Sequence, residues 1–98
     1  MRFEWDEDKN RHNLAKRKVG FETASLVFDD PQALSVQDRM VEGEERWQTV
    51  GMVSGILLLV ARTWWDEPGE ETVRLISARK AVPGERRAYA ESQKRSSQ

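Results

Sequence analysis

The segment RWQTVGMVSGILLLVARTWW, residues 46–65, decides how this chain folds. Its first part, Arg46–Val53, is predicted to be a strand. Ser54-Gly55 predicts a two-residue hairpin turn, because glycine supplies the positive φ that such turns need. The last part, Ile56–Trp65, is apolar at consecutive positions, so it is expected to be a central strand that is covered on both faces.

The segments on either side of this hairpin carry further strand signals. Ala33–Gln37 has the period-two pattern of a strand, and the polar residues Asp38–Glu45 that follow it are predicted to form a loop. Asp66–Gly69 is a turn signal, because proline and glycine stand in the order that a type II turn requires. Thr72–Arg79 alternates again and is predicted to be the last strand.

Helices are predicted near both ends of the chain, where capping residues and apolar side chains at helical spacing occur. Together with one short strand, the predicted elements are a strand at Phe3–Trp5, a helix from Asp6 as N-cap to Lys16, a helix at Phe21–Phe28 and a helix at Pro83–Ser92. Residues 92–98 are polar and are expected to fray. The order of these elements predicts an α+β fold. It is an antiparallel sheet of about four strands with N-terminal helices and a C-terminal helix, in one domain over residues 1–98.

Composition excludes several classes of protein. The chain has no cysteine and a single histidine, His12, so neither a disulfide scaffold nor a multi-histidine zinc site can form, and no metal or cofactor is expected. The longest apolar run, Ile56–Ala61, is too short to cross a bilayer, and residues 1–5 lack the pattern of a signal peptide. These features predict a soluble cytoplasmic protein with no membrane partner.

Charge is distributed unevenly along the chain. Residues 1–20 have a net charge of +2, residues 21–73 of −8 and residues 74–98 of +5. Two surfaces of opposite sign are therefore expected, a basic one that suits nucleic acid and an acidic one that suits a basic partner. The alternative is that these charges are only solvated.

Arginines at strand ends and on strands suggest a chemistry. Arg46 begins one strand, Arg62 interrupts an apolar run, and Arg79 and Lys80 close the last strand. A guanidinium near a covered strand is costly unless it pairs or faces a ligand, and it binds phosphate with a planar fork of donors. Such cations suit metal-independent RNA cleavage, in which the ribose 2′-OH attacks the adjacent phosphate through a dianionic transition state.

These cations and the acidic residues near them form the predicted site. The catalytic group is predicted to be Arg46, Arg62, Arg79, Lys80 and Glu45, with Glu44 and Glu85 as other candidate bases and His12 and Tyr89 as further acid–base groups. RNA contacts are predicted at Lys16, Arg17, Lys18, Arg86 and Arg87. Each of these residues also has a purely structural explanation. Arg46 can form an ion pair, and Arg62 can reach solvent along its aliphatic stem. Arg79 and Lys80 can contact a partner, and residues 85–87 can be a solvated helix face. One ring of Trp64-Trp65 is a candidate for stacking on a base, although core packing is the simpler explanation.

Motifs spread over nearly the whole chain resemble one family of bacterial toxins. The segments that carry the resemblance are FEWDEDKN at residues 3–10, NLAK at 13–16, FETA at 21–24, VFDDP at 27–31, EERWQTVG at 44–51, RLISARKA at 74–81 and ERRAY at 85–89. Each is weak alone, but in this order they resemble the BrnT toxin family.

The resemblance implies a RelE-like fold and a ribonuclease toxin of a type II toxin–antitoxin system that inhibits translation. It also implies a BrnA-type antitoxin whose ribbon-helix-helix portion binds DNA, so that operator DNA is contacted only through the complex. Arg46, Arg79 and Lys80 match basic positions of the family. The antitoxin has two possible binding surfaces on this chain. An acidic helix of the antitoxin covers the basic face, or the antitoxin binds the acidic middle at residues 21–73.

Two stretches differ from the family pattern. Lys16-Arg17-Lys18 stands where members usually have Lys-His-Gly. On the central strand, members usually have a His or Tyr followed by Thr, Glu and Arg, whereas this chain has Arg62-Thr63-Trp64-Trp65. Trp65 thus replaces the family arginine, and the cation is expected to have moved to Arg62. The alternative function is therefore a weakened or inactive homologue that binds the antitoxin and regulates the operon. A general RNA-binding protein is a third possibility.

Overall fold

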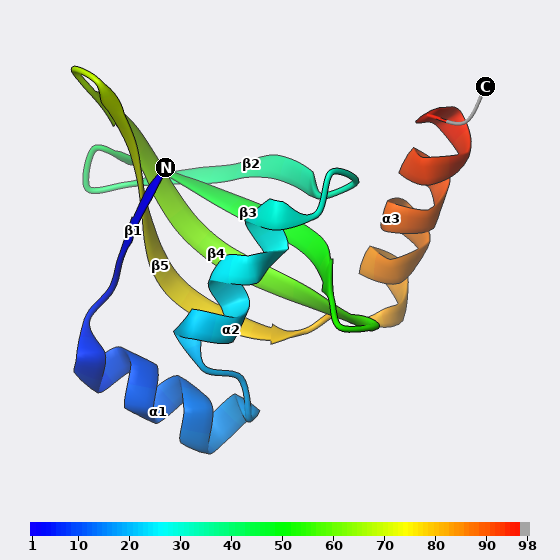
Figure 1. The fold of residues 1–98 in the computed structure, drawn as a ribbon, viewed down its shortest axis with the longest axis horizontal. Coiled ribbons are helices and arrows are strands. Elements are labelled where there is room, and N and C mark those ends of the chain that lie inside the picture. The colour runs from blue at the N-terminus through cyan, green and yellow to red at the C-terminus, as the bar shows by residue number, and fades with distance from the viewer. Residues whose placement is uncertain (97–98) are drawn as a thin grey trace.

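A computed structural model describes residues 1–96 of the chain (Figure 1). In chain order its elements are β1 (Arg2–Glu4), α1 (Glu7–Arg17), α2 (Phe21–Ser25), a 3-10 helix (Leu26–Asp29), β2 (Leu34–Val41), β3 (Glu44–Val53), β4 (Ile56–Glu67), β5 (Glu70–Lys80) and α3 (Pro83–Ser96). The strands form one sheet in the order β1-β5-β4-β3-β2.

The central position of β4 confirms the prediction from its apolar sequence. β4 pairs with β3 on one side and with β5 on the other, both antiparallel. Val53 pairs with Ile56, so Ser54 and Gly55 alone form the turn, with φ of 49° and 84°. Both residues have the positive φ of a type I′ hairpin, whose twist matches that of the strands.

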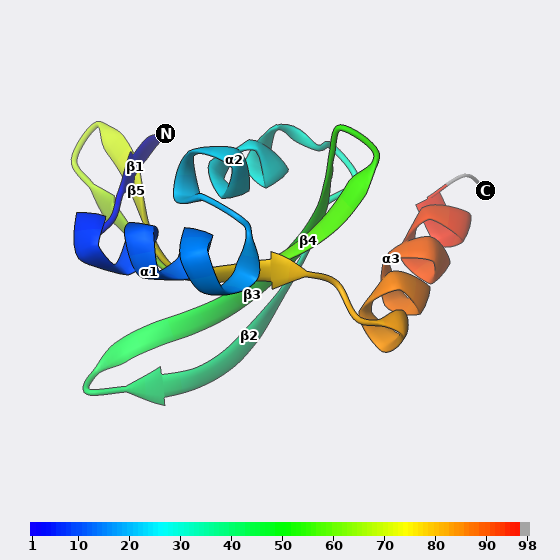
Figure 2. The same cartoon turned by 90° about the horizontal axis from the view of Figure 1, so that it is seen from below.

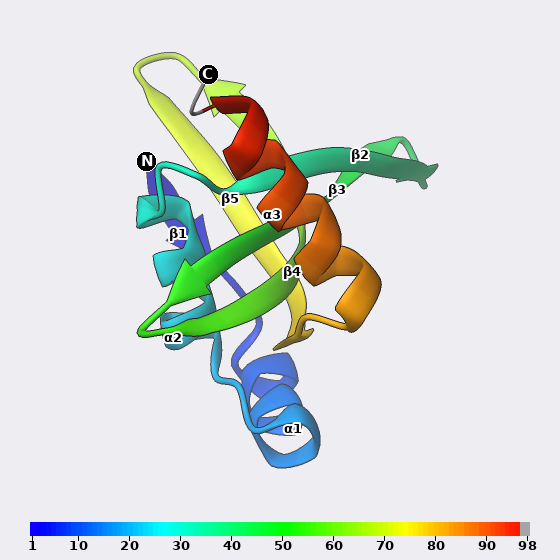
Figure 3. The same cartoon turned by 90° about the vertical axis from the view of Figure 1, so that its right-hand side faces the viewer.

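Helices cover both faces of the sheet. On one face, called here the α2 face, Phe21 and Val27 pack against Val60 and Leu75 in the larger core cluster. On the other, the α3 face, Tyr89 of α3 packs with residues that include Leu59 of β4. Figure 3 shows α3 in front of the sheet, and Figure 2 shows it at the opposite end of the molecule from the tips of the β2–β3 and β4–β5 hairpins.

The sheet differs from the predicted four antiparallel strands. β1 adds a fifth strand that runs parallel to β5, with Phe3 opposite Val73. Phe3 also packs on Phe28, with ring centroids 5.4 Å apart. This long-range contact explains why three residues suffice for a strand. The sheet is therefore mixed.

The prediction of a polar loop at Asp38–Glu45 is wrong. β2 continues to Val41, and Glu42-Gly43 form a second tight turn with φ of 50° and 81°. Periodicity predicted this edge strand only as far as Gln37, because the side chains of residues 38–40 are all exposed and give no alternating pattern. A register shift between Gln37 and Met40 places a β-bulge in its middle.

α3 is longer than predicted. It runs to Ser96 instead of ending near Ser92, so the helix continues into the segment that was expected to fray, and residues 97–98 lie outside the described part. Val82 lacks a capping side chain, but Glu85 accepts a 2.9 Å hydrogen bond from its backbone N–H. This is the half of a capping box in which the third helical residue reaches back to the N-cap.

Asn13 holds α1 against β5 by hydrogen bonds, at a point on this strand beyond the end of its pairing with β1. Its side-chain amide donates to the carbonyls of Val19 and Ala78 at 2.8 and 2.9 Å and accepts from the Ala78 N–H at 3.2 Å. The amide thus satisfies backbone groups on the outer edge of β5. α1 is consequently held beside the segment of β5 that carries Ser77 and Arg79.

Candidate active site

Two of the predicted arginines share the α3 face. Arg46 lies opposite Thr63 of β4, and Arg79 lies opposite Leu59. Residues four apart on a strand point to the same side, so both side chains leave this face from backbone positions about 13 Å apart along the strand direction. The Nε atom of Arg46 is buried and has no hydrogen-bond partner among the described residues.

Arg62 points to the opposite face, so the structure does not bring it together with Arg46 and Arg79, the other arginines of the predicted catalytic group. It lies opposite Trp47 and is only 9% exposed. Its guanidinium donates to the hydroxyls of Thr49 and Ser35, each at 3.1 Å, and it lies 5.3 Å from the centre of the Phe28 ring. Burial lowers the pKa of Arg62. The group is held inside the α2 face and does not reach Arg46 or Arg79.

Arg79 forms the best-defined charge pair of the α3 face. Its two terminal nitrogens donate to the two carboxylate oxygens of Glu85, both at 2.9 Å, and the pair is partly buried. The hydrogen bonds from Arg79 lower the pKa of Glu85, and those to Glu85 raise the pKa of Arg79. Both groups therefore carry full charge near neutral pH. A predicted phosphate-binding cation and a candidate base are therefore in direct contact.

A basic groove lies between α1 and β5, and its last lining residue on β5 is Ser77, two positions before Arg79. It has a volume of about 390 Å³ and is lined by Asp8, Lys9, His12, Asn13, Lys16, Arg17, Ile76 and Ser77. The α1 residues are spaced so that one face of the helix looks onto β5. Ser77 and Arg79 are two residues apart, on the same side of β5 and about 7 Å from one another. The groove therefore leads towards the Arg79–Glu85 pair.

The remaining basic residues are spread more widely. Lys18 is the left-handed C-cap of α1, with φ of 63°. Lys80 and Arg86 line a separate pocket beside the β3–β4 hairpin, and Arg87 is exposed on α3. Of the predicted RNA contacts, only Lys16 and Arg17 line the groove.

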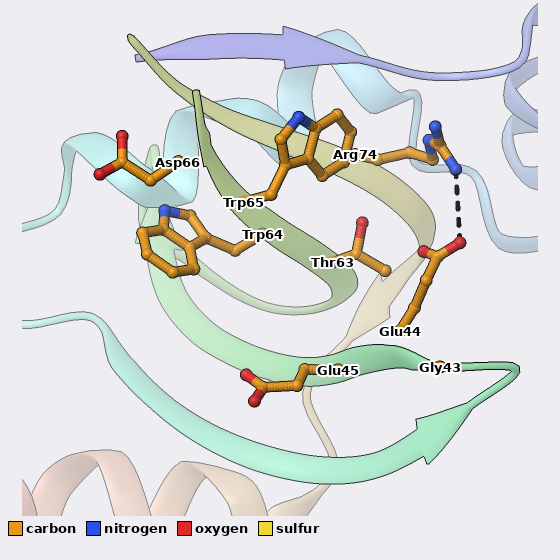
Figure 4. A pocket seen from close by; sticks show the side chains of 8 residues that line it. All are labelled: Gly43, Glu44, Glu45, Thr63, Trp64, Trp65, Asp66 and Arg74. Atoms are coloured by element: carbon orange, nitrogen blue, oxygen red, sulfur yellow. Dashed lines mark ion pairs between the residues drawn. The ribbon is translucent and has the colours of Figure 1, made fainter. Parts of the chain in front are cut away.

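The two predicted glutamates of β3 lie at the far end of the sheet. Glu44 is 3.8 Å from Arg74, and Glu45 is exposed and points to the opposite side of the strand from Arg46. Both line a pocket of about 540 Å³ together with Gly43, Thr63, Trp64, Trp65, Asp66 and Arg74 (Figure 4). Glu85 is therefore better placed than Glu45 to act with Arg79.

Tyr89 is tied up by a structural hydrogen bond. Its phenol is 4% exposed and donates to Asp30 at 2.7 Å. Burial and the Asp30 carboxylate raise the pKa of Tyr89. The phenol is thus held as a neutral donor and is not presented to the groove.

Three features of the site lay beyond sequence reasoning. Ser77 of the groove gave no signal, because a single serine on a strand is common. Arg74 stacks 5.2 Å from the centre of the Trp65 ring, and this pairing depends on the β4–β5 register. The Arg79–Glu85 contact had a weak signal, since Glu85 stands at the third position of a helix that follows the strand.

Comparison with known proteins agrees with the motifs. A family model described as "Ribonuclease toxin, BrnT, of type II toxin-antitoxin system" matches residues 5–85. No curated protein matches the chain. In the part of the chain that the structure describes, no helix has the length and apolar character that crossing a membrane requires. The matched region includes α1, the whole β2–β5 meander and the Arg79–Glu85 pair. The chain belongs to the BrnT family of ribonuclease toxins of type II toxin–antitoxin systems.

Proposed function

We propose that this chain cleaves RNA without a metal ion, by attack of a ribose 2′-OH on the adjacent phosphate. The contact between Arg79 and Glu85 carries the proposal, because it supplies a fixed cation and an ionised carboxylate on one face. The products of such a reaction are a 2′,3′-cyclic phosphate and a free 5′-OH. Electrostatic stabilisation of the dianionic transition state is the largest contribution expected from the protein.

Each residue has a defined role in this proposal. Glu85 takes the proton of the 2′-OH, and Arg79 moves its donors to the non-bridging phosphate oxygens. The departing 5′-oxygen takes up a proton, for which His12 in the adjoining groove is the candidate donor. Lys16 and Arg17 bind neighbouring phosphates along the groove. Arg46 lies on the same face but opposite Thr63, beside the acidic hairpin tips, so no contact with RNA is proposed for it.

The test compares Arg79→Ala with Arg39→Ala, a control that removes an exposed arginine of β2 with no described ion pair. Purified protein is incubated with labelled RNA in EDTA, with and without ribosomes. Wild type and the control are expected to cleave, and Arg79→Ala is expected to lose about 100-fold or more in rate. Intact RNA with folded wild-type protein in both conditions, or full cleavage by Arg79→Ala, contradicts the proposal.

The cellular effect of this cleavage and the protein partner are inferred from the family. We propose that cleavage inhibits translation in the cytoplasm and that a BrnA-type ribbon-helix-helix antitoxin neutralises the chain. The complex then binds operator DNA through the antitoxin and represses its own operon. Membership of a type II toxin–antitoxin family supports an antitoxin partner. A short open reading frame of ribbon-helix-helix type directly downstream is the expected genomic observation.

One observation favours a second function. Arg62 is held on the opposite face by Thr49 and Ser35, and the family resemblance places Trp65 where an arginine is expected on the central strand. A homologue that has lost cleavage and only binds its antitoxin fits this observation. Such a protein causes no growth arrest when expressed alone, yet it co-purifies with the antitoxin and supports operator binding.

A further inference from the structure

The two long hairpins bring acidic residues to one end of the molecule. The β2–β3 tip contributes Glu42, Glu44 and Glu45, and the β4–β5 tip contributes Asp66, Glu70 and Glu71. Both tips lie at the left-hand end in Figures 1 and 2, away from α3. A field of this sign repels RNA phosphates and attracts cations.

The pocket at this end is walled by tryptophans and carboxylates. Trp64 and Trp65 line it with Glu44, Glu45, Asp66 and Arg74 (Figure 4). Arg74 offsets only part of this charge, because its guanidinium pairs with Glu44 of the pocket at 3.8 Å and with Glu4 outside the pocket at 3.1 Å. Among the described residues, neither Glu45 nor Asp66 has an ion-pair partner. The pocket therefore has an excess of negative charge beside aromatic faces.

Thr63 supplies an independent sign that the pocket takes a hydrogen-bond donor. The residue is 2% exposed, and its hydroxyl oxygen has no hydrogen-bond partner among the described residues. An unsatisfied buried hydroxyl is costly. Figure 4 shows Thr63 inside the pocket, with Glu44 and Arg74 on one side and Trp64 and Asp66 on the other.

We propose that this pocket binds an arginine side chain from a basic segment of the antitoxin. A guanidinium has five N–H donors, which match the two unpaired carboxylates and the Thr63 hydroxyl, and its plane stacks on an indole. The pocket volume of about 540 Å³ accommodates such a side chain with the backbone beside it. The inference rests on the proposed antitoxin, and it assigns this partner to the end of the sheet that RNA avoids.

The first experiment measures the chemistry of the pocket directly. The folded chain is titrated with acetyl-Gly-Arg-Gly-Arg-Gly-amide while tryptophan fluorescence is followed. The matched peptide has citrulline in place of arginine, which keeps the shape and removes the charge. We expect saturable binding of the arginine peptide only. Equal binding of both peptides, or no saturable binding, overturns the proposal.

Paired charge-reversal variants then locate the binding. Asp66→Lys changes the pocket, and Glu22→Lys makes the same change in charge at an exposed site on α2. Asp66→Lys is expected to weaken the binding of both the arginine peptide and the co-expressed antitoxin about tenfold or more. Glu22→Lys is expected to leave both affinities unchanged. An equal effect of the two variants shows general attraction and overturns the assignment.

Two further readouts separate this inference from its competitors. RNA cleavage by free Asp66→Lys is expected to equal that of wild type, and its loss places RNA in the pocket and overturns the inference. Sedimentation of the chain alone reports whether a second copy occupies the pocket, and self-association abolished by Asp66→Lys overturns the antitoxin assignment. If wild type cleaves no RNA, the proposed ribonuclease function fails while the peptide titration still decides the pocket.

Discussion

The Tyr89 phenol of α3 donates a 2.7 Å hydrogen bond to Asp30, 59 positions earlier in the chain. The same carboxylate accepts from the backbone N–H of Met52 at 2.8 Å and of Gln32 at 2.9 Å. One side chain thus joins α3, the end of β3 and the segment before β2. Elsewhere α3 has little apolar contact with the sheet, so this carboxylate is a main point of attachment.

Tyr89→Phe is expected to lower the free energy of unfolding by about 1.5 kcal/mol, because it removes a hydrogen bond to a charged acceptor and keeps the ring. Urea denaturation measures the loss. Hydrogen exchange is expected to accelerate in α3 more than in β4, since the helix loses an attachment and the central strand does not. An unchanged urea midpoint contradicts this role for the hydroxyl.

Stability is expected to fall in acid through two carboxylates. Burial raises the pKa of Asp30, but hydrogen bonds from Met52, Tyr89 and Gln32 outweigh it and leave the pKa lowered. The hydrogen bonds from Arg79 lower the pKa of Glu85. A lowered folded-state pKa gives stability that is present above the unfolded-state value and lost as pH falls through the folded-state value.

Unfolding free energies measured from pH 7 down to pH 3 check this dependence. The decline is expected to begin near the ordinary carboxyl pKa of about 4 and to steepen below it. Glu85→Gln removes one of the two groups and is expected to flatten the curve. A Glu85→Gln curve parallel to that of wild type shows that the Arg79 contact contributes no pH-dependent stability.

Arg62→Met is expected to fold with less than about 2 kcal/mol of lost stability. The methionine refills the space between Phe28 and Trp47, and the Ser35 and Thr49 hydroxyls still bond to each other at 2.9 Å. RNA cleavage per folded molecule is expected to match wild type, because Arg62 faces away from Arg79. A large loss of cleavage by folded Arg62→Met returns this arginine to the catalytic group.

Asn13→Ala is expected to cost about 3 kcal/mol, because the amide group of Ala78 and the carbonyl of Val19 lose their partners in a buried position. Arg11→Ala on the same helix removes only an exposed ion pair with Asp8 and is expected to change stability by less than about 0.5 kcal/mol. Thermal or urea unfolding of the two variants gives the comparison. Equal effects rule out a special role for the Asn13 amide.

The sequence predicted those parts of the fold in which the residue types match the burial and the turn geometry of the same segment. Ile56–Trp65 is apolar on both sides because β4 is covered on both sides, and Ser54-Gly55 has the residues of a type I′ turn. β2 was cut short because its exposed side chains carry no periodic signal, although its backbone pairs with β3. β1 was not placed in the sheet as a parallel strand because its partner is about 70 residues away.

The site was predicted less well, because it depends on which way side chains point. The family resemblance and the cationic strand ends identified Arg46 and Arg79, and the α3 face holds both. Arg62 has similar sequence surroundings, but the alternation along β4 turns it to the other face. Glu85 was one of three candidate glutamates, and only the turn between β5 and α3 brings it to Arg79.

The β-bulge in β2 has a consequence beyond the single molecule. β2 is the outermost strand next to β3, so its free backbone groups offer a template for a strand from another chain. The bulge between Gln37 and Met40 breaks that template into two short runs, and the charged pair Asp38-Arg39 stands at the break. A strand added from outside finds no continuous ladder longer than about four residues. An unpartnered toxin that accumulates in the cell is thereby protected from growing into fibrils along this edge.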